Sequence, residues 1–306
     1  MKPAHAAKGN PSPGGIHPRS RHVNDIHVAH SILQNKPAQD IIPAGRRKLM
    51  ICISTAMVAY PSLTKNSSAR TVNSPQPPSV DSSSSTTDIK KSYNQYAKNY
   101  DDLDGGVVAD ALGFPDQRKA LLQEATGDVL ETAVGTGLNL QYYNLKNVRS
   151  FTAIDLSPGM LRQAQLKATF LQFPSSSTSS SSSRSSNSFL SFQQADIATL
   201  PFPDNSFDSV VDTFSLCVFP DPAAALRSMT RVVRPGGKVL LLEHSRSTSP
   251  VLGWYQDITA AQVASMGKGC VWNQDVIKLV ENAGLRIERV DKYVGDLVLS
   301  ITAVKV

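Results

Sequence analysis

The chain has 306 residues, of which 41% are hydrophobic, and a formal net charge of +6 at pH 7. The positive charge lies in residues 1–85, which hold ten Lys/Arg and three Asp/Glu, so the remaining residues carry a net charge of −1. Nucleic-acid enzymes usually carry positive charge on the folded domain, so no nucleic-acid partner is expected. Cys52, Cys217 and Cys270 form no C-x-x-C pair, which supports neither a disulfide framework nor a metal site.

Residues 1–87 are predicted to be a disordered targeting leader and linker. Residues 1–48 are rich in Pro, Ala, Ser, His and basic groups, which is typical of a transit peptide. Arg46, Arg47 and Lys48 then precede a short apolar segment at 49–60, whereas a membrane-spanning helix needs about 20 apolar residues. This arrangement resembles the thylakoid-transfer half of a bipartite plastid leader. An organellar location is expected, with the chloroplast, including its thylakoid membrane, favoured over the mitochondrion; a membrane-touching or disordered leader is the alternative.

A folded domain is predicted over residues 88–306, interrupted by a Ser-rich surface insertion at 174–188. A tract of serines cannot build a core, and a long surface loop costs little, so the insertion marks a surface connection. The first predicted helix covers 88–103, with Tyr93, Tyr96 and Tyr100 at helical spacing, and a second helix follows Pro115.

Strands then alternate with helices along the rest of the chain. Strands are predicted at 129–133, 150–156, 189–195, 207–214 and 238–243, with helices at 138–145, 159–171 and 221–234 between them and a tight turn at 235–237. Helices at 250–266 and 273–283 precede two closing strands, 286–293 and 297–305, which should be antiparallel to each other. This order predicts an α/β fold: a Rossmann-like, seven-stranded, mostly parallel sheet with helices on both faces and an antiparallel closing strand.

The glycine loop VLETAVGTGLNL, residues 129–140, is the most informative motif. Gly135 and Gly137 permit positive φ, and a strand, a tight turn and a helix N-terminus together make a ligand cradle. A dinucleotide fingerprint would need a third glycine at Leu140, and a Walker loop would need a following Gly-Lys-Ser/Thr. The carboxylate of Glu131 beside the loop suits a ligand that carries a cation.

Four spaced motifs resemble those of class I S-adenosylmethionine-dependent methyltransferases of the ubiquinone/menaquinone-biosynthesis type. These motifs are ETAVGTG, AIDLSPGML, QADIATLPFPDNSFDSVV and RVVRPGGKVLLLEH. Together they cover the region from about Tyr93 to Val306. EHSRS, Trp254 and MGKGCVWNQDVIKLVENAGL further resemble a membrane-associated, thiol-methyltransferase-like branch of that family. The family usually has a glycine where this chain has Ala133, and the methyl group should be tolerated if the backbone there is extended.

The resemblance implies S-adenosylmethionine as cofactor and assigns each of its parts a partner. Glu131 would meet the ammonium, directly or through water, Asp155 both ribose hydroxyls, and Asp196 the adenine amine. Asp155 as a helix N-cap and Asp196 as an ordinary turn residue are the structural alternatives. The complete cofactor set is Glu131, Ala133, Gly135, Thr136, Gly137, Asp155, Leu156, Met160, Asp196, Ile197 and Phe214.

Methyl transfer is an in-line displacement in which the enzyme mainly aligns the reactants and excludes water. His244, the only histidine after residue 30, is the candidate base, with a structural histidine as the alternative. Asp212 is the second catalytic candidate, with a buried core acid as its alternative. Cys217 is interpreted as a small buried hydrophobe. Tyr96 and Tyr100 on a lid helix, together with Trp254 on an apolar wall, are the predicted acceptor contacts.

The predicted activity is therefore methyl transfer to a small apolar acceptor: a thiol, a quinone-like ring or a lipid. Peripheral membrane contact is the other partnership that the leader suggests, and the sequence does not indicate an oligomeric state. A catalytically weak, S-adenosylmethionine-binding assembly factor is the alternative function. A nicotinamide-dependent oxidoreductase shares the fold but needs the third glycine.

Overall fold

The computed structural model describes residues 86–98, 100–101, 107–174, 189–266 and 269–306. Residues 1–85 of the predicted leader and linker, which include the apolar segment at 49–60, lie outside these residues, as do all but the first residue of the Ser-rich insertion. No helix in the described ranges combines the length and the apolar character needed to cross a bilayer.

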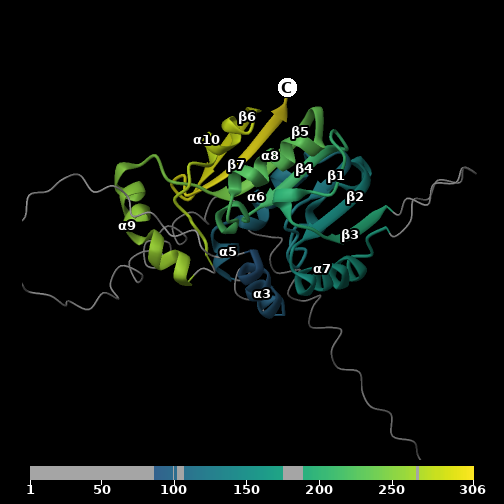
Figure 1. The fold of residues 1–306 in the computed structure, drawn as a ribbon, viewed down its shortest axis with the longest axis horizontal. Helices are drawn as coiled ribbons and strands as arrows, with labels where there is room; N and C mark the ends of the chain where they lie inside the picture. The colour runs from purple at the N-terminus through teal and green to yellow at the C-terminus, as the bar shows by residue number, and fades with distance from the viewer. Residues whose placement is uncertain (1–85, 99, 102–106, 175–188, 267–268) are drawn as a thin grey trace, which may run out of the picture. The chain divides into compact units, whose positions relative to one another are not determined.

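Seven strands form one sheet, in the order β3-β2-β1-β4-β5-β7-β6 (Figure 1). The strands are β1 (Gly127–Glu131), β2 (Val148–Asp155), β3 (Leu190–Gln194), β4 (Phe207–Thr213), β5 (Val233–His244), β6 (Leu285–Tyr293) and β7 (Val298–Lys305). Neighbouring strands from β3 to β5 are parallel, and β7 runs antiparallel to both β5 and β6. The predicted sheet and its antiparallel closing pair are confirmed.

The helices connect these strands and cover the sheet. They are α3 (Thr86–Tyr96), α5 (Val107–Ala111), α6 (Phe114–Leu122), α7 (Pro158–Phe170), α8 (Pro222–Val232), α9 (Pro250–Met266) and α10 (Val276–Asn282). Single 3-10 turns are η1 (Leu140–Tyr142), η2 (Leu145–Asn147), η3 (Ile197–Thr199) and η4 (Leu216–Val218).

The central strands are buried on both faces, because successive residues enter two different cores. Leu130 and Leu241 pack with α8 and α10, whereas the neighbouring Val129 and Leu240 pack with α6 and α7. Continuous apolar strands of this kind are what a parallel sheet covered on both sides requires. The strand order reverses between β1 and β4, which creates a crevice at the carboxyl ends of the strands.

Two predicted elements differ from the structure. The helix expected at 138–145 is absent, because the chain after the glycine loop makes only the turns η1 and η2. The tight turn expected at 235–237 is instead a bulge within β5: the pairing with β4 shifts between Phe207 and Ser209, and Gly236 has φ +75°. In addition, the first helix, α3, begins at Thr86 and ends at Tyr96 instead of reaching 103.

Candidate functional site

A pocket of about 240 Å³ lies at the carboxyl ends of β1, β2, β3 and β4. Its floor comes from the residues that end these strands or follow them, and residues of α3 form its cover. Figure 1 shows α3 beside the N-terminal part of α7, below the carboxyl edge of the sheet. Of the predicted cofactor contacts, eight line the pocket: Ala133, Gly135, Asp155, Leu156, Met160, Asp196, Ile197 and Phe214.

The glycine loop is bonded to the sheet and turns sharply. Val134 N donates to Ile154 O of β2, and Gly137 N donates to Val134 O. Gly135 and Gly137 have φ values of +57° and +82°, as the motif requires. Ala133 has φ +45°, so its backbone is left-handed and not extended. The methyl group of Ala133 was expected to be tolerated only if the backbone there is extended. The left-handed backbone does not meet this condition, because a Cβ in that region is strained.

Asp155 is the acid that bridges the glycine loop and helix α7. Its Oδ2 accepts from Gly135 N at 2.9 Å, and its Oδ1 accepts from Ser157 N at 2.8 Å. Burial raises the pKa of this carboxyl to about 6, although the backbone N–H groups oppose the shift. The α7 N-cap is Ser157, whose hydroxyl accepts from Met160 N, so Asp155 does not have that role. Its two oxygens retain lone pairs that can accept from a diol.

Asp196 and its neighbours line the side of the pocket formed by β3. One oxygen of Asp196 accepts from Ala198 N at 2.9 Å, so Asp196 caps η3 and also lines the pocket. Leu156, Met160 and Ile197 supply apolar walls next to it. An acid between apolar walls matches a flat ring that carries a hydrogen-bond donor.

Glu131 does not line the pocket. It is 1% exposed, and its carboxylate accepts from Asn139 Nδ2 at 2.8 Å and from Tyr143 OH at 2.9 Å. Burial raises the pKa of Glu131 to about 7, and the charge of Arg118 opposes this shift. The cation near Glu131 in this arrangement is the protein's own Arg118, and a contact of Glu131 with the methionine ammonium stays a prediction.

Arg118 is a half-buried residue of this network that the sequence did not reveal. Its guanidinium donates to Asn139 Oδ1 at 2.5 Å and to Thr213 Oγ1 at 2.9 Å, and it lies 5.0 Å from the centre of the Phe214 ring. It thus connects the glycine loop to the end of β4. Its segment, DQRKALL, looks like an ordinary helix with a polar face, so no sequence signal distinguishes Arg118.

Thr136 and Gly137 support the pocket from behind its lining. The Thr136 hydroxyl donates to Asp101, which also pairs with Lys167 of α7 at 2.6 Å. A Cβ on Gly137 would lie 2.7 Å from Leu140 and 3.2 Å from the backbone of Ala164, so only glycine fits there. These contacts hold the segment after α3 against the glycine loop.

The tyrosines of the predicted lid differ in their position relative to the pocket. Tyr93 and Tyr100 line the pocket, with ring centres 6.4 Å apart, and Asn94 accepts from Gly159 N at 2.8 Å, which holds α3 on the start of α7. Tyr96 does not line the pocket and is 37% exposed, because it lies on the outer side of α3.

Trp254 also lies away from the pocket. It is 60% exposed on α9, where Val251 and Ile258 are exposed as well. An apolar wall is instead supplied by Val218, Phe219 and Pro220, which follow β4.

The two catalytic candidates lie behind the pocket wall. Asp212 is fully buried; its carboxylate accepts from Thr132 Oγ1 at 2.7 Å and from Ser215 Oγ at 2.5 Å. Glu243 is equally buried next to Asp212. Burial raises the pKa of Asp212 to about 6, and burial together with the charge of Asp212 raises the pKa of Glu243. The His244 ring packs on Phe214 at 5.1 Å between centres and does not line the pocket. Neither side chain is placed to touch a ligand directly.

Comparison with known proteins identifies the chemistry of this pocket. A family model described as a methyltransferase domain matches residues 130–241. The mitochondrial methyltransferase OMS1 of Saccharomyces cerevisiae is 26% identical over 174 residues, which is 56% of this chain and 36% of that protein. The phosphatidylethanolamine N-methyltransferase of Cereibacter sphaeroides is 30% identical over 192 residues, 58% of this chain and 85% of that enzyme.

A third relative is the ubiquinone/menaquinone biosynthesis C-methyltransferase UbiE of Hahella chejuensis, which is 34% identical over 134 residues, 44% of this chain and 49% of that enzyme. The chain thus spans about a third of the yeast protein, about half of UbiE and most of the Cereibacter enzyme. The pocket fits the cofactor of these enzymes, because it offers an acid for a diol, an acid for an exocyclic amine and apolar walls for a ring. The chain belongs to the class I S-adenosylmethionine-dependent methyltransferases, in the ubiquinone/menaquinone-biosynthesis-like group.

Proposed function

We propose that the chain transfers the methyl group of S-adenosylmethionine to a small apolar acceptor. The observation that carries this proposal is the division of one pocket into two parts. Asp155 and Asp196 lie at the ends of β2 and β3, whereas Val218, Phe219 and Pro220 make an apolar wall beyond β4. The first part suits the cofactor, and the second suits an acceptor with little polarity.

S-adenosylmethionine supplies an electrophilic methyl group on a positively charged sulfur. Asp155 would hold the ribose, with its carboxylate already positioned by the N–H groups of Gly135 and Ser157. Asp196 would accept from the adenine amine, and Met160 and Ile197 would pack on the ring. Residues of helix α3 line the pocket, and in this proposal α3 limits the access of water, which would favour an in-line displacement.

The acceptor that fits best is one that reaches its nucleophilic form without a base in the pocket. His244 lies behind Phe214, so it is not placed to remove a proton from a molecule in the pocket. A thiol or a phenol ionises partly near neutral pH when a cation is close by. Lys90 is the only Lys or Arg among the described residues that line the pocket, and it supplies such a cation.

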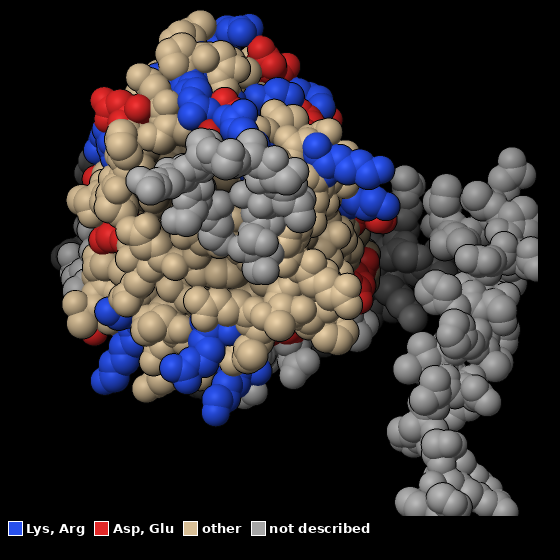
Figure 2. Space-filling model, turned by 90° about the vertical axis from the view of Figure 1, so that its right-hand side faces the viewer, with Lys and Arg blue, Asp and Glu red and all other residues tan. Residues whose placement is uncertain are grey.

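The names of the relatives support the same chemical range. One acts on phosphatidylethanolamine, a lipid, and another is named for ubiquinone and menaquinone biosynthesis. A lipid head group and a quinone-like ring therefore remain beside a thiol as acceptors. Transfer to a polynucleotide is not part of the proposal. On the face shown in Figure 2, basic side chains are visible at the top, at the upper right and at the bottom, and acidic side chains lie among those at the top.

The test is an acceptor panel with the full chain and radiolabelled S-adenosylmethionine. Apolar thiols, phenols, quinols and phosphatidylethanolamine vesicles are compared with hydrophilic amines, and Lys90→Met is the matched variant. Apolar thiols or phenols should be methylated in preference to amines, and Lys90→Met should raise the acceptor KM with little change in cofactor affinity. Equal methylation of hydrophilic amines would contradict the proposal.

Cofactor binding without turnover is the second candidate function, as for an assembly factor. The left-handed backbone of Ala133 in the glycine loop is the observation that favours it. Calorimetric titration distinguishes the candidates: a non-catalytic chain would bind S-adenosylmethionine and S-adenosylhomocysteine yet methylate nothing in the panel. Binding of NADH alone would exclude both.

We further propose that the chain acts inside an organelle and touches a membrane surface peripherally. The composition of residues 1–48 supports an organellar address, and the mitochondrial name of the yeast relative supports the same class of address. The twin arginine before residues 49–60 favours the chloroplast. Import of the full chain into isolated chloroplasts and mitochondria tests this choice, and retention outside both would contradict it.

A further inference from the structure

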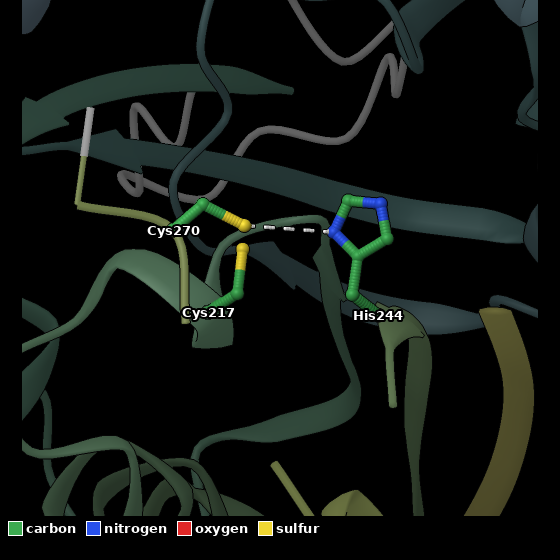
Figure 3. Close-up of side chains that lie close together, drawn as sticks. All are labelled: Cys217, His244 and Cys270. Carbon is green, nitrogen blue, oxygen red and sulfur yellow. Dashed lines mark hydrogen bonds between the residues drawn. The ribbon is translucent and has the colours of Figure 1, made fainter. Parts of the chain in front are cut away.

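Folding brings together three side chains that the sequence keeps apart. Cys217 lies in η4, His244 is the last residue of β5, and Cys270 lies in the segment before α10. The two sulfurs and one nitrogen of His244 all lie within 4.8 Å of one another. Figure 3 shows both sulfurs on the side of the ring that carries Nδ1, and Cys270 Sγ lies 4.0 Å from that nitrogen.

Backbone hydrogen bonds fix the segments that carry these side chains. Val271 N donates to Cys217 O at 2.7 Å, which joins the Cys270 segment directly to η4. Arg246 N donates to Gln274 O at 2.8 Å, which joins the same segment to the end of β5. The side-chain amide of Gln256 donates to Ser245 O and Trp272 O, so α9 connects the segment after β5 with the segment that carries Cys270. The cluster is therefore positioned by the fold and not by chance contact of long side chains.

We propose that Cys217, His244 and Cys270 bind one Zn²⁺ ion through two thiolates and the imidazole Nδ1. Zinc bonds of about 2.3 Å to sulfur and about 2.0 Å to nitrogen place tetrahedral ligand atoms roughly 3.5–3.8 Å apart. The observed separations, none above 4.8 Å, reach that range with shifts of an ångström or less at the ends of short side chains. No metal site is expected from the sequence, because the two cysteines are far apart along the chain.

The donor set selects the class of ion. Two thiolates and an imidazole suit a borderline-soft, tetrahedral ion such as Zn²⁺ and exclude Mg²⁺ and Ca²⁺, which prefer oxygen. Three protein ligands leave a fourth position for water or another donor.

Zinc here would change the role assigned to His244. A nitrogen that binds a metal cannot remove a proton, so His244 would be a structural ligand instead of the general base. The ion would also tie η4 to β5, and η4 contributes Val218 to the pocket wall. The site would thereby position the acceptor wall without touching the cofactor contacts at Asp155.

Cobalt titration of the reduced full chain tests the site, because Co²⁺ bound to thiolates gives a near-ultraviolet charge-transfer band and tetrahedral visible bands. The expected result is one cobalt per chain, displaced by one zinc. Cys217→Ser and Cys270→Ser should each weaken cobalt binding by more than the roughly 10–100-fold that loss of an outer-shell partner costs. Cys52→Ser is the matched control and should leave the spectrum unchanged. His244→Asp should retain a shifted spectrum, whereas His244→Phe should lose it.

A second measurement needs no variant. Zinc should slow alkylation of Cys270 in the full chain, read by mass spectrometry, while Cys52 serves as the internal reference, and a chelator should remove the protection. No cobalt binding by the reduced wild-type chain, cobalt binding without a thiolate band, or equal alkylation of Cys270 with and without zinc would each overturn the proposal. None of these results depends on the identity of the methyl acceptor, so the zinc site and the proposed function can fail separately.

Discussion

The two ends of the central strands carry the same acidic residue types in opposite environments. At the amino ends, Asp128 of β1 and Asp208 of β4 face Arg149 and Arg234, with Arg149 at 2.7 Å and Arg234 at 2.6 Å from Asp208. At the carboxyl ends, Asp155, Asp212 and Glu131 accept from N–H and O–H donors, and no arginine or lysine of the described residues forms a salt bridge with them. The first group lies at the protein surface, whereas Asp212 and Glu131 of the second group are buried and Asp155 lines the pocket.

The consequence is a difference in the sign of the pKa shifts. Hydrogen bonds and charges from the arginines hold the pKa values of Asp128 and Asp208 below their usual range, despite some desolvation. Desolvation raises the pKa of Asp155 to about 6 and that of Glu131 to about 7. Acids whose pKa is raised by burial beside a pocket are typical of functional sites, whereas paired surface acids are typical of scaffold. The carboxyl end of the sheet is thus the functional end, and the amino end maintains the fold.

The largest expected effect comes from exchanging one acid at each end for alanine. Asp155→Ala removes the acceptor of both ribose hydroxyls, and hydrogen bonds to a charged group contribute about 1.5–3 kcal/mol each, so S-adenosylmethionine should bind at least about 100-fold more weakly. Asp128→Ala should lower stability and leave the affinity unchanged. Isothermal titration calorimetry on the two folded variants measures both values.

An equal loss of S-adenosylmethionine affinity in Asp155→Ala and Asp128→Ala would contradict this expectation, because it would show that the effect is not specific to Asp155. Asp155→Asn refines it, since an amide keeps one accepting oxygen and the shape of the side chain. An intermediate affinity is expected for this variant.

The pH dependence of stability should separate the two ends next. Between about pH 4, where the unfolded acids titrate, and pH 6–7, Asp155 and Glu131 bind protons in the native state that the unfolded chain does not bind. The free energy of unfolding should therefore fall as pH rises through this window, by a few kcal/mol at about 1.4 kcal/mol per pKa unit. Asp128 and Asp208 have lowered pKa values, so they stabilise above about pH 4 and lose that contribution at lower pH.

Urea unfolding of the full chain from pH 3 to pH 8 measures this dependence. Glu131→Gln should flatten the upper part of the curve, while Arg149→Gln should not. S-adenosylmethionine should bind more tightly as pH rises through about 6, because the ionised form of Asp155 is the better acceptor, and Asp155→Asn should remove that rise. Cofactor affinity that is constant from pH 5 to pH 7.5 would contradict an acidic ribose contact.

The sequence predicted correctly which residues lie at the pocket where a residue directly follows a recognisable strand. Asp155, Asp196 and Gly135 follow strands whose apolar runs are easy to recognise, and parallel strands bring their carboxyl ends to one edge. The order of the sheet and the boundaries of α9 follow from the same periodicity.

Prediction failed where the partner of a side chain comes from a distant segment. Arg118 meets Asn139 and Thr213 only after folding, and the Cys217 and Cys270 thiols meet through the segment before α10. Tyr96 and Trp254 were placed at the pocket by residue type, but helix position turns both toward solvent. The helix expected after the glycine loop is missing because Asn139 and Tyr143 turn inward to bind Glu131. Propensity along the chain does not encode such contacts.

A smaller effect is expected at the amino end. Arg149→Gln removes pairs with Asp128 and Asp208, but the Arg149 side chain is 63% exposed, so the free energy of unfolding should fall by only about 1 kcal/mol or less. High salt should shrink the difference from the wild type, because it screens exposed charges. The matched control is Arg162→Gln on exposed α7 surface, which makes the same charge change and should have a smaller effect. A loss of cofactor affinity in Arg149→Gln would contradict the division between the two ends.

The smallest effect, and the only gain, is expected at the functional end itself. Ala133 has φ +45°, where an L-residue costs about 1–2 kcal/mol, whereas glycine in ordered structure costs about 0.5–1 kcal/mol in backbone entropy. Ala133→Gly should therefore raise the free energy of unfolding by about 0.5–1 kcal/mol, and cofactor affinity should rise with it because the loop is relieved of strain at the pocket wall. Ala198→Gly, also at the pocket but without positive φ, should lower stability instead. If Ala133→Gly is more stable but binds S-adenosylmethionine more weakly, the left-handed backbone at Ala133 contributes to cofactor binding. The strain after β1 would then be a conformation that the protein retains because the ligand requires it.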